Sequence, residues 1–299
     1  MENFIIVITY LLIGTALRRM PAFPNETGNV LNLFVIYVSL PALVLLKIPD
    51  LPFSKHLLVP AIMPWAMLLL SGAILLFLSR LLKWDRPTTG CLLILIPLGN
   101  TSFLGIPMVK IFFGDQAVPY AVLYDQLGSF LALATYGTLI IALYSTGKSK
   151  PTLPDMVRKI ISFPPFIALV LAFILKPFSY PLIAINILEV LASTLVPVVM
   201  IAVGFQLTLR LNKAVTSQLA IGLTIKLVIT PLVALFICQL AGLEGEVVQV
   251  SIFESGMPPM VSAGALAILA NLSPSLAAAL VGIGIVLSFA TLPILYQLL

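Results

Sequence analysis

Two stretches of the sequence combine proline, glycine and polar residues inside otherwise apolar runs. The first extends from Leu95 to Pro107, and the second from Phe253 to Gly264. Proline lacks a backbone donor and glycine adds backbone freedom, so both stretches predict helices that are broken near their middle. Each half-helix that starts at such a break presents free N–H groups, which favour an anion.

Polar side chains beside the two breaks could complete an anion site. Asn100 offers an amide donor, and Thr101 or Ser255 offers a hydroxyl. If the two broken helices cross, both breaks contribute to one site. The residues predicted to bind substrate are Asn100, Thr101, Gly105, Pro107, Ser255, Gly256, Pro258 and Pro259. The alternative is that the prolines only kink two packed helices.

Four ionisable residues lie within apolar runs: Glu189, which can reach the headgroup region, and the deeper Asp125, Lys226 and Glu254. Charged groups at membrane depth are costly and mark functional sites by default. Glu254 or Asp125 could bind a coupling cation or a proton. Lys226 could pair with a carboxylate, compensate the C-terminal ends of half-helices, or attract an anion. The three deeper residues are therefore predicted to serve in coupling or charge compensation, and the sequence does not decide which acid faces Lys226.

The composition requires that the residues above be positioned by membrane-spanning helices. The chain has 299 residues, of which 61% are hydrophobic and 9% charged, and its mean hydropathy is +1.16. Soluble domains carry about 25% charged residues, so this chain could not cover a surface that faces water. The net charge of +5 does not indicate nucleic-acid binding, because most basic residues lie between apolar segments, where they set membrane orientation. The two cysteines, Cys91 and Cys238, lie in apolar runs, and the single histidine, His56, lies in a loop. Together they predict neither a metal site nor a catalytic group.

Ten apolar runs predict an all-α protein of about ten transmembrane helices. They lie at 3–17, 27–46, 57–82, 88–113, 117–146, 157–175, 181–208, 214–240, 246–270 and 274–298. A hydrophilic segment at 147–156 separates a first five-helix repeat (1–146) from a second (157–299). A five-helix unit used twice in tandem must have opposite topology in its two copies, which predicts two inverted repeats with crossed, broken fourth and ninth helices.

The distribution of basic residues predicts the orientation. Most of the 16 Lys and Arg residues fall in loops that follow odd-numbered helices. Positive loops mark the cytoplasmic face. The protein is therefore predicted to lie in the inner (plasma) membrane of the cell with both termini on the outside.

The run from Asn100 to Pro107, the break at Met257-Pro258-Pro259 and the five-plus-five layout resemble the auxin efflux carrier family. Bacterial members of that family are described as malonate and malate permeases. The resemblance implies a fold like that of bile acid/sodium symporters and sodium/proton antiporters. It also implies a dimer-forming scaffold (helices 1, 2, 6 and 7) and a transport domain (helices 3–5 and 8–10) that moves like an elevator. In plant carriers the asparagine that matches Asn100 contacts the substrate carboxylate. Unlike those carriers, this chain has no ionisable residue in span 57–82 before Arg80, which argues against auxin as substrate.

The function predicted from these features is secondary active transport of organic anions, small carboxylates foremost, by an elevator-type mechanism. The expected partners are a small organic anion, the lipid bilayer and a second copy of the chain, without nucleic acid. No cofactor or metal is expected, and coupling to protons or sodium stays open. Two alternatives remain: a cation/proton antiporter on the same fold and a non-transporting membrane sensor. An enzyme is not expected, since no nucleophile–base pair or ligand cluster occurs at depth.

Overall fold

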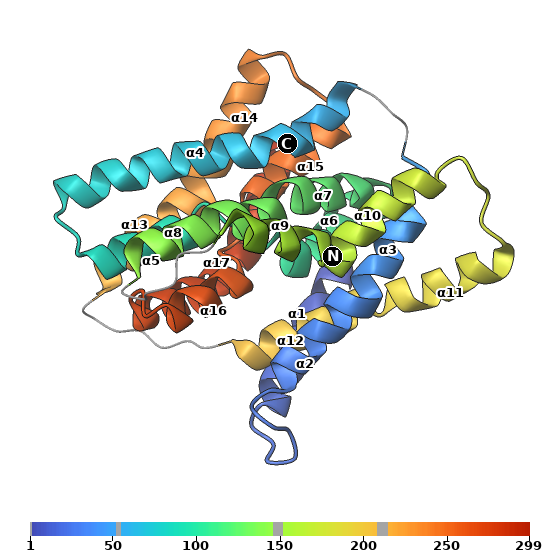
Figure 1. Cartoon of the computed structure of the whole chain (residues 1–299), viewed down its shortest axis with the longest axis horizontal. Helices are drawn as coiled ribbons and strands as arrows, with labels where there is room; N and C mark the ends of the chain where they lie inside the picture. The colour runs from blue at the N-terminus through green and yellow to red at the C-terminus, as the bar shows by residue number, and fades with distance from the viewer. Residues whose placement is uncertain (1, 52–54, 146–151, 208–214) are drawn as a thin grey trace. The chain divides into compact units, whose positions relative to one another are not determined.

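The computed structural model describes residues 2–51, 55–145, 152–207 and 215–299. Within these ranges every regular element is a helix, and the only β-type pairing is an isolated bridge between Gly99 and Pro259 (Figure 1). The prediction of an all-α protein is confirmed for the described residues. The expected hydrophilic linker 147–156 lies partly outside them, and its last residues begin α9 (Leu153–Ile161).

Six described helical segments are long and apolar enough to cross a membrane. They are Thr27–Lys47, Lys55–Leu81, Asp115–Tyr144, Leu182–Gln206, Thr216–Leu240 and Pro274–Leu298. A seventh would be α9 joined to α10 (Pro164–Leu175), which are bent by 63°. Ile5–Leu17 and Thr101–Phe113 are shorter apolar helices. The predicted spans 88–113 and 246–270 are missing from these six because each is divided into shorter helices.

The chain divides into two compact units that each draw on both halves of the sequence. Unit 1 comprises 1–54, 102–122 and 158–207, and unit 2 comprises 55–101, 123–157 and 208–299. Three elements cross the division: η3 (Thr101–Gly105), α7 (Val118–Tyr124) and α9.

Unit 1 consists of helices from the first, second, sixth and seventh predicted spans, together with the second half of the fourth span and the start of the fifth. Its helices are α1 (Glu2–Leu17), α2 (Thr27–Phe34), η1 (Val35–Ser39), α3 (Leu40–Lys47), α6 (Ile106–Phe113), η4 (Asp115–Ala117), α10, α11 (Leu182–Ser193) and α12 (Leu195–Gln206). In it α10 and α11 pack on α3, and α12 packs on α2.

Helices α1 and α12 lie side by side in unit 1 with their backbones almost touching (Figure 1). A β-carbon added to Gly14 would lie 2.1 Å from the carbonyl oxygen of Ile201, and one added to Gly204 would lie 2.0 Å from that of Leu11. The hydroxyl of Thr15 donates to the Gly204 carbonyl at 3.2 Å. Small residues permit this close approach, which drives helix association where lipid replaces water.

Unit 2 holds both helix breaks and the three deeply buried charges. Its helices are η2 (Lys55–Leu57), α4 (Leu58–Leu81), α5 (Arg86–Leu95), η5 (Asp125–Phe130), η6 (Leu133–Gly137), α8 (Thr138–Tyr144), α13 (Thr216–Thr224), η8 (Ile225–Ile229), α14 (Thr230–Leu240), α15 (Glu246–Ser255), α16 (Val261–Leu269) and α17 (Pro274–Leu298). Helices α16 and α17 pack on α5, and α15 packs on α4 and α14. An aliphatic core that includes Leu92, Leu95, Ala263 and Leu280 joins these helices.

Candidate functional site

Both predicted helix breaks are present, and they have the same length. Helix α5 ends at Leu95 and η3 begins at Thr101, which leaves 96–100 without helical structure. Helix α15 ends at Ser255 and α16 begins at Val261, which leaves 256–260 in the same condition. The prediction that proline and glycine interrupt these two spans is confirmed.

The two breaks pair with each other as a short antiparallel bridge. The amide N–H of Asn100 donates to the carbonyl of Pro258 at 2.8 Å, and the N–H of Met260 donates to the carbonyl of Leu98 at 3.0 Å. Gly99 and Pro259 face each other between these bonds. Because Pro258 and Pro259 have no N–H, the bridge takes its donors from the neighbouring residues. It therefore satisfies unwound backbone groups that lipid could not.

The segments that leave the bridge are both helix starts. Thr101, the first residue of η3, follows Asn100, and Val261, the first residue of α16, follows Met260. No side chain caps the N-terminus of α16. The first N–H groups of a helix have no partner within it and carry partial positive charge, so these starts favour an anion.

Asn100 is the side chain at the crossing that retains a free donor. Its exposed fraction is 2%, and among the described residues its Nδ2 atom has no hydrogen-bond partner. A buried amide without a partner costs about 1–3 kcal/mol, unless a ligand accepts its hydrogen bond. This position therefore suits an acceptor such as a carboxylate oxygen.

The other two predicted donors are already engaged within the protein. The hydroxyl of Thr101 donates to Oδ1 of Asp125 at 2.5 Å, and the hydroxyl of Ser255 donates to the carbonyl of Ile252 at 2.6 Å. The structure thus makes Thr101 a support for Asp125. Each hydroxyl oxygen can still accept a hydrogen bond.

The predicted glycines and prolines are distributed over both units. Gly256 follows α15, and its N–H donates to the Phe253 carbonyl at 3.1 Å. It is confined, because an added β-carbon would meet Leu295 at 2.8 Å. Gly105 ends η3, and Pro107 lies in the first turn of α6. Both of these belong to unit 1, whereas the bridge lies in unit 2.

The three predicted intramembrane charges are buried in unit 2 and differ in their partners. Asp125 accepts from Thr101 at Oδ1 and from Nε2 of Gln126 at Oδ2, the latter at 2.7 Å. Lys226 donates to the carbonyl of Ser255, the last residue of α15, at 3.2 Å. Within the described chain neither carboxylate oxygen of Glu254 has a hydrogen-bond partner. Of the roles considered for Lys226, its geometry matches compensation of a half-helix C-terminus, where carbonyls carry negative partial charge.

A small cavity of about 10 Å³ lies beside the bridge. Its walls include Gly99, Thr101, Tyr124, Lys226 and Glu254. That volume is close to the minimum for one water molecule. An organic anion does not fit this volume unless the surrounding helices move.

The sequence analysis did not predict the π-helical turns that carry two of the buried charged residues. Asp125 and Lys226 each lie in a π-helical turn, η5 and η8. Such turns concentrate at functional sites. Gln126 was also missed as a partner of Asp125, although a second polar residue next to a buried acid is a usable signal. Gly99 adds a further constraint, because a β-carbon there would lie 3.2 Å from Nζ of Lys226.

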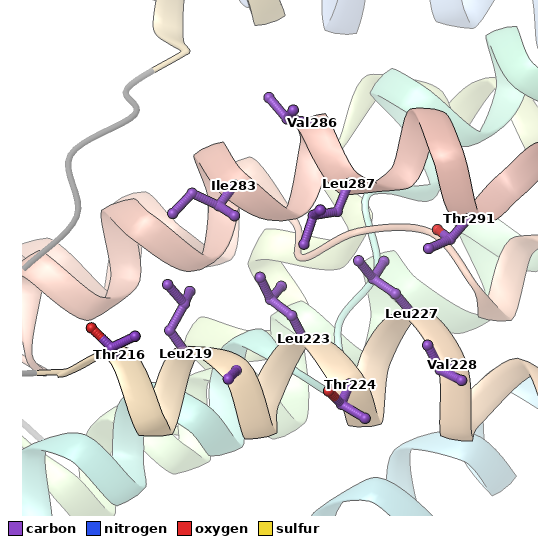
Figure 2. A pocket seen from close by; sticks show the side chains of 11 residues that line it. Thr216, Leu219, Leu223, Thr224, Leu227, Val228, Ile283, Val286, Leu287 and Thr291 are labelled. Atoms are coloured by element: carbon purple, nitrogen blue, oxygen red, sulfur yellow. The ribbon is translucent and has the colours of Figure 1, made fainter. Parts of the chain in front are cut away.

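A second, larger cavity in unit 2 does not suit an anion. It has a volume of about 570 Å³ and runs between α17 and the α13–η8 segment (Figure 2). Leucine, isoleucine, valine and alanine side chains line it together with Thr216, Thr224 and Thr291. No charged side chain is among the described residues that line this cavity.

Three relatives that match most of this chain are named as transporters. The chain is 28% identical over 267 residues to an uncharacterized transporter of Methanocaldococcus jannaschii, covering 86% of this chain and 85% of the relative. It is 27% identical over 296 residues to an uncharacterized transporter of Methanothermobacter thermautotrophicus, covering 98% and 96%. It is 24% identical over 261 residues to a protein of Rhizobium meliloti named as a "putative malonate transporter", covering 83% and 79%.

The family profile described as "membrane transport protein" matches residues 1–296 of the chain. Together with the apolar helices, this makes the protein a multi-pass membrane protein. The chain therefore belongs to the membrane transport protein family, the auxin efflux carrier family that the run from Asn100 to Pro107 indicates.

Proposed function

We propose that this protein is a secondary transporter of small organic anions that binds a substrate carboxylate at the crossing of its two broken helices. The observation that carries the proposal is the buried Nδ2 of Asn100, which has no partner among the described residues. The uncapped start of α16 adds partial positive charge beside the same bridge. The printed name of the Rhizobium meliloti relative makes malonate the first substrate to test.

Transport proceeds in this proposal by an elevator-type movement of a transport domain against a scaffold. The scaffold is helices 1, 2, 6 and 7 of the predicted ten, and the transport domain is helices 3–5 and 8–10. The division into compact units supports this scheme, because unit 1 contains 1–54 and 158–207 and unit 2 contains the bridge. Residues 102–122, the second half of the fourth span, cluster with unit 1 instead. The small cavity at the crossing also supports a mechanism that requires movement.

The proposed topology is two inverted five-helix repeats in the plasma membrane with both termini outside. The equal breaks at 96–100 and 256–260 and their mutual pairing support a pseudo-twofold relation. The scaffold unit is the proposed contact between two copies in a homodimer. Accessibility of single cysteines placed before Ile5 and after Leu298 to an impermeant reagent tests the orientation.

One observation favours the second candidate, a cation/proton antiporter. Asp125 and Glu254 interact electrostatically, as two acids at an ion site would. Lys226 interacts with the same Glu254 and brings a fixed positive charge that a metal cation would have to approach. For this reason we place the organic-anion transporter first.

The test is substrate counterflow into proteoliposomes that contain the purified full chain. Labelled malonate, malate and monocarboxylates are compared for wild type and Asn100→Ala. Accumulation by the wild type that fails in the variant supports the crossing as the anion site. If the folded wild type binds a carboxylate without moving it, the sensor alternative applies. If it neither binds nor moves any carboxylate but exchanges sodium for protons, the antiporter alternative applies.

A further inference from the structure

Glu254 is a carboxylate with no hydrogen-bond partner in the described chain, although it is fully buried. Its exposed fraction is 0%, and among the described residues neither Oε1 nor Oε2 has a hydrogen-bond donor. A buried charge is usually paired or hydrogen-bonded, because an isolated one has a large desolvation cost. Glu254 instead faces the cavity of about 10 Å³ that it shares with Lys226 and Tyr124. The structure leaves this carboxylate ready to take up a very small ligand.

The two buried acids, Asp125 and Glu254, differ in their hydrogen-bond donors. Asp125 has a side-chain donor at each oxygen, Thr101 at one and Gln126 at the other. Both carboxylate oxygens of Asp125 therefore accept hydrogen bonds within the protein. Lys226, whose exposed fraction is 3%, supplies one positive charge. With both acids ionised the cluster has a net charge of −1, and with one proton bound it is neutral. Glu254 is the acid on which that proton can reside without displacing an existing bond.

The other elements packed against Glu254 add no further buried charge. Helix α4 carries only Arg80 in its last turn, α14 has no ionisable residue other than Cys238, and η2 carries Lys55 and His56, both exposed. Helix α17 contributes the phenol of Tyr296, whose ring meets that of the neighbouring Phe253 edge-on at 6.5 Å. Among the described residues, Asp125, Lys226 and the Tyr124 phenol are the groups found to interact electrostatically with Glu254.

The cavity discriminates between the two coupling ions left open by the sequence. A sodium ion placed there would share a space of about 10 Å³ with the ammonium of Lys226. Two cations inside one cavity of this size repel strongly, because a buried site screens charge poorly. A proton avoids this repulsion, because it becomes part of Glu254 and removes a charge without adding an ion.

We infer that Glu254 is the proton-binding residue that couples transport to the pH gradient, with Lys226 as its counter-charge and Asp125 as a hydrogen-bonded support. The step is a carboxylate plus a hydronium ion giving a carboxylic acid plus water, and it reverses on the opposite side of the membrane. This inference rests on the proposed function, because the transported anion is what the proton accompanies.

The sign of the coupling follows from charge. A substrate carboxylate at Asn100 adds a negative charge beside the cluster and thereby favours the protonated form of Glu254. By reciprocity, a proton on Glu254 strengthens anion binding by the same factor. Proton and anion therefore bind together, which is symport.

The experiment compares wild type, Glu254→Gln and Glu254→Asp with the matched control Glu244→Gln. Glu244 lies in the exposed loop that precedes α15, three residues before Val247, so its substitution removes a carboxyl of the same type from outside the cluster. Proteoliposomes report malonate accumulation driven by an imposed pH gradient, and malonate exchange at equal pH on both sides over a range of pH. An infrared pH titration of the lipid-embedded protein without substrate reports the carbonyl band of a buried carboxylic acid.

The expected result is that wild type, Glu254→Asp and Glu244→Gln accumulate malonate under a pH gradient and show the titrating infrared band. Glu254→Gln is expected to lose the band, to lose accumulation driven by the pH gradient, and to exchange malonate at a rate independent of pH. Size-exclusion chromatography and thermal unfolding establish that each variant is folded.

Two results would overturn the inference. One is an infrared band, or an accumulation driven by the pH gradient, that survives in folded Glu254→Gln. The other is malonate accumulation by the wild type that follows a sodium gradient and ignores pH. A third outcome separates the two proposals. If the wild type moves no carboxylate but shows the infrared band, and Glu254→Gln lacks that band, the proposed substrate class is refuted and Glu254 remains a proton site.

Discussion

The backbone amide of Asn100 donates to the carbonyl of Pro258 at 2.8 Å, one of the two backbone hydrogen bonds that join the broken helices. The same residue holds its side-chain Nδ2 unpartnered among the described atoms. Asn100 thus has a structural bond through its backbone and an available donor through its side chain. Substitution of the side chain separates the two roles.

Asn100→Ala is expected to weaken binding of malonate with little change in folding, because the backbone bond to Pro258 remains. A hydrogen bond to a charged group contributes about 1.5–3 kcal/mol, which corresponds to about a 10- to 100-fold increase in Kd. Asn100→Asp should weaken binding further, because it places a second negative charge against the substrate. Isothermal titration with malonate, with thermal unfolding as the folding control, measures both. Unchanged affinity in Asn100→Ala would remove the crossing as the carboxylate site.

Thr101→Val is expected to destabilise unit 2, because it leaves Oδ1 of Asp125 without the donor at 2.5 Å. The cost of removing one partner of a buried charged hydrogen bond is about 1–3 kcal/mol. Thr135→Val is the matched control, since that half-buried hydroxyl donates only to the Leu131 carbonyl of its own helix at 2.6 Å. Thermal unfolding in detergent compares the two. Equal melting temperatures would mean that Asp125 does not depend on Thr101.

Lys226→Met is expected to abolish transport and to lower stability. The substitution removes the bond at 3.2 Å to the C-terminal carbonyl of α15 and leaves two carboxyl groups without their cation. The loss of that charged bond alone is worth about 1.5–3 kcal/mol. Lys159→Met, at an exposed position in α9, serves as the control. Normal counterflow in Lys226→Met would show that the cluster needs no fixed positive charge.

Gly204→Ala is expected to disrupt unit 1, because its β-carbon would lie 2.0 Å from the carbonyl oxygen of Leu11, which is backbone and cannot rotate away. Gly72→Ala in α4 makes the same chemical change where the nearest atom is 3.7 Å distant. That control should be neutral or stabilising by up to about 1 kcal/mol, since alanine has the higher helix propensity. Yield and melting temperature of the purified proteins provide the comparison. Tolerance of Gly204→Ala would contradict the close contact of α1 and α12.

The sequence by itself determined that the chain is a membrane protein with two broken helices and three buried ionisable residues. Hydropathy decides the solvent, because so few charges cannot cover a surface exposed to water. Proline lacks its N–H in any surroundings, so the interruptions at 96–100 and 256–260 are local properties. The predicted count of ten spans is not confirmed, because six described helices are long enough to cross a membrane and half-helices such as α5 and α15 are shorter.

Only the tertiary structure decided how those residues divide their tasks. The pairing of Leu98–Asn100 with Pro258–Met260, the engagement of Thr101 and Ser255, and the contrast between bonded Asp125 and unbonded Glu254 all depend on partners distant in sequence. The π-helical turns that carry Asp125 and Lys226 likewise have no clear sequence signature. Whether a buried polar group is free or satisfied depends on which atoms the fold places within hydrogen-bond reach, and that cannot be read from the residue's own type.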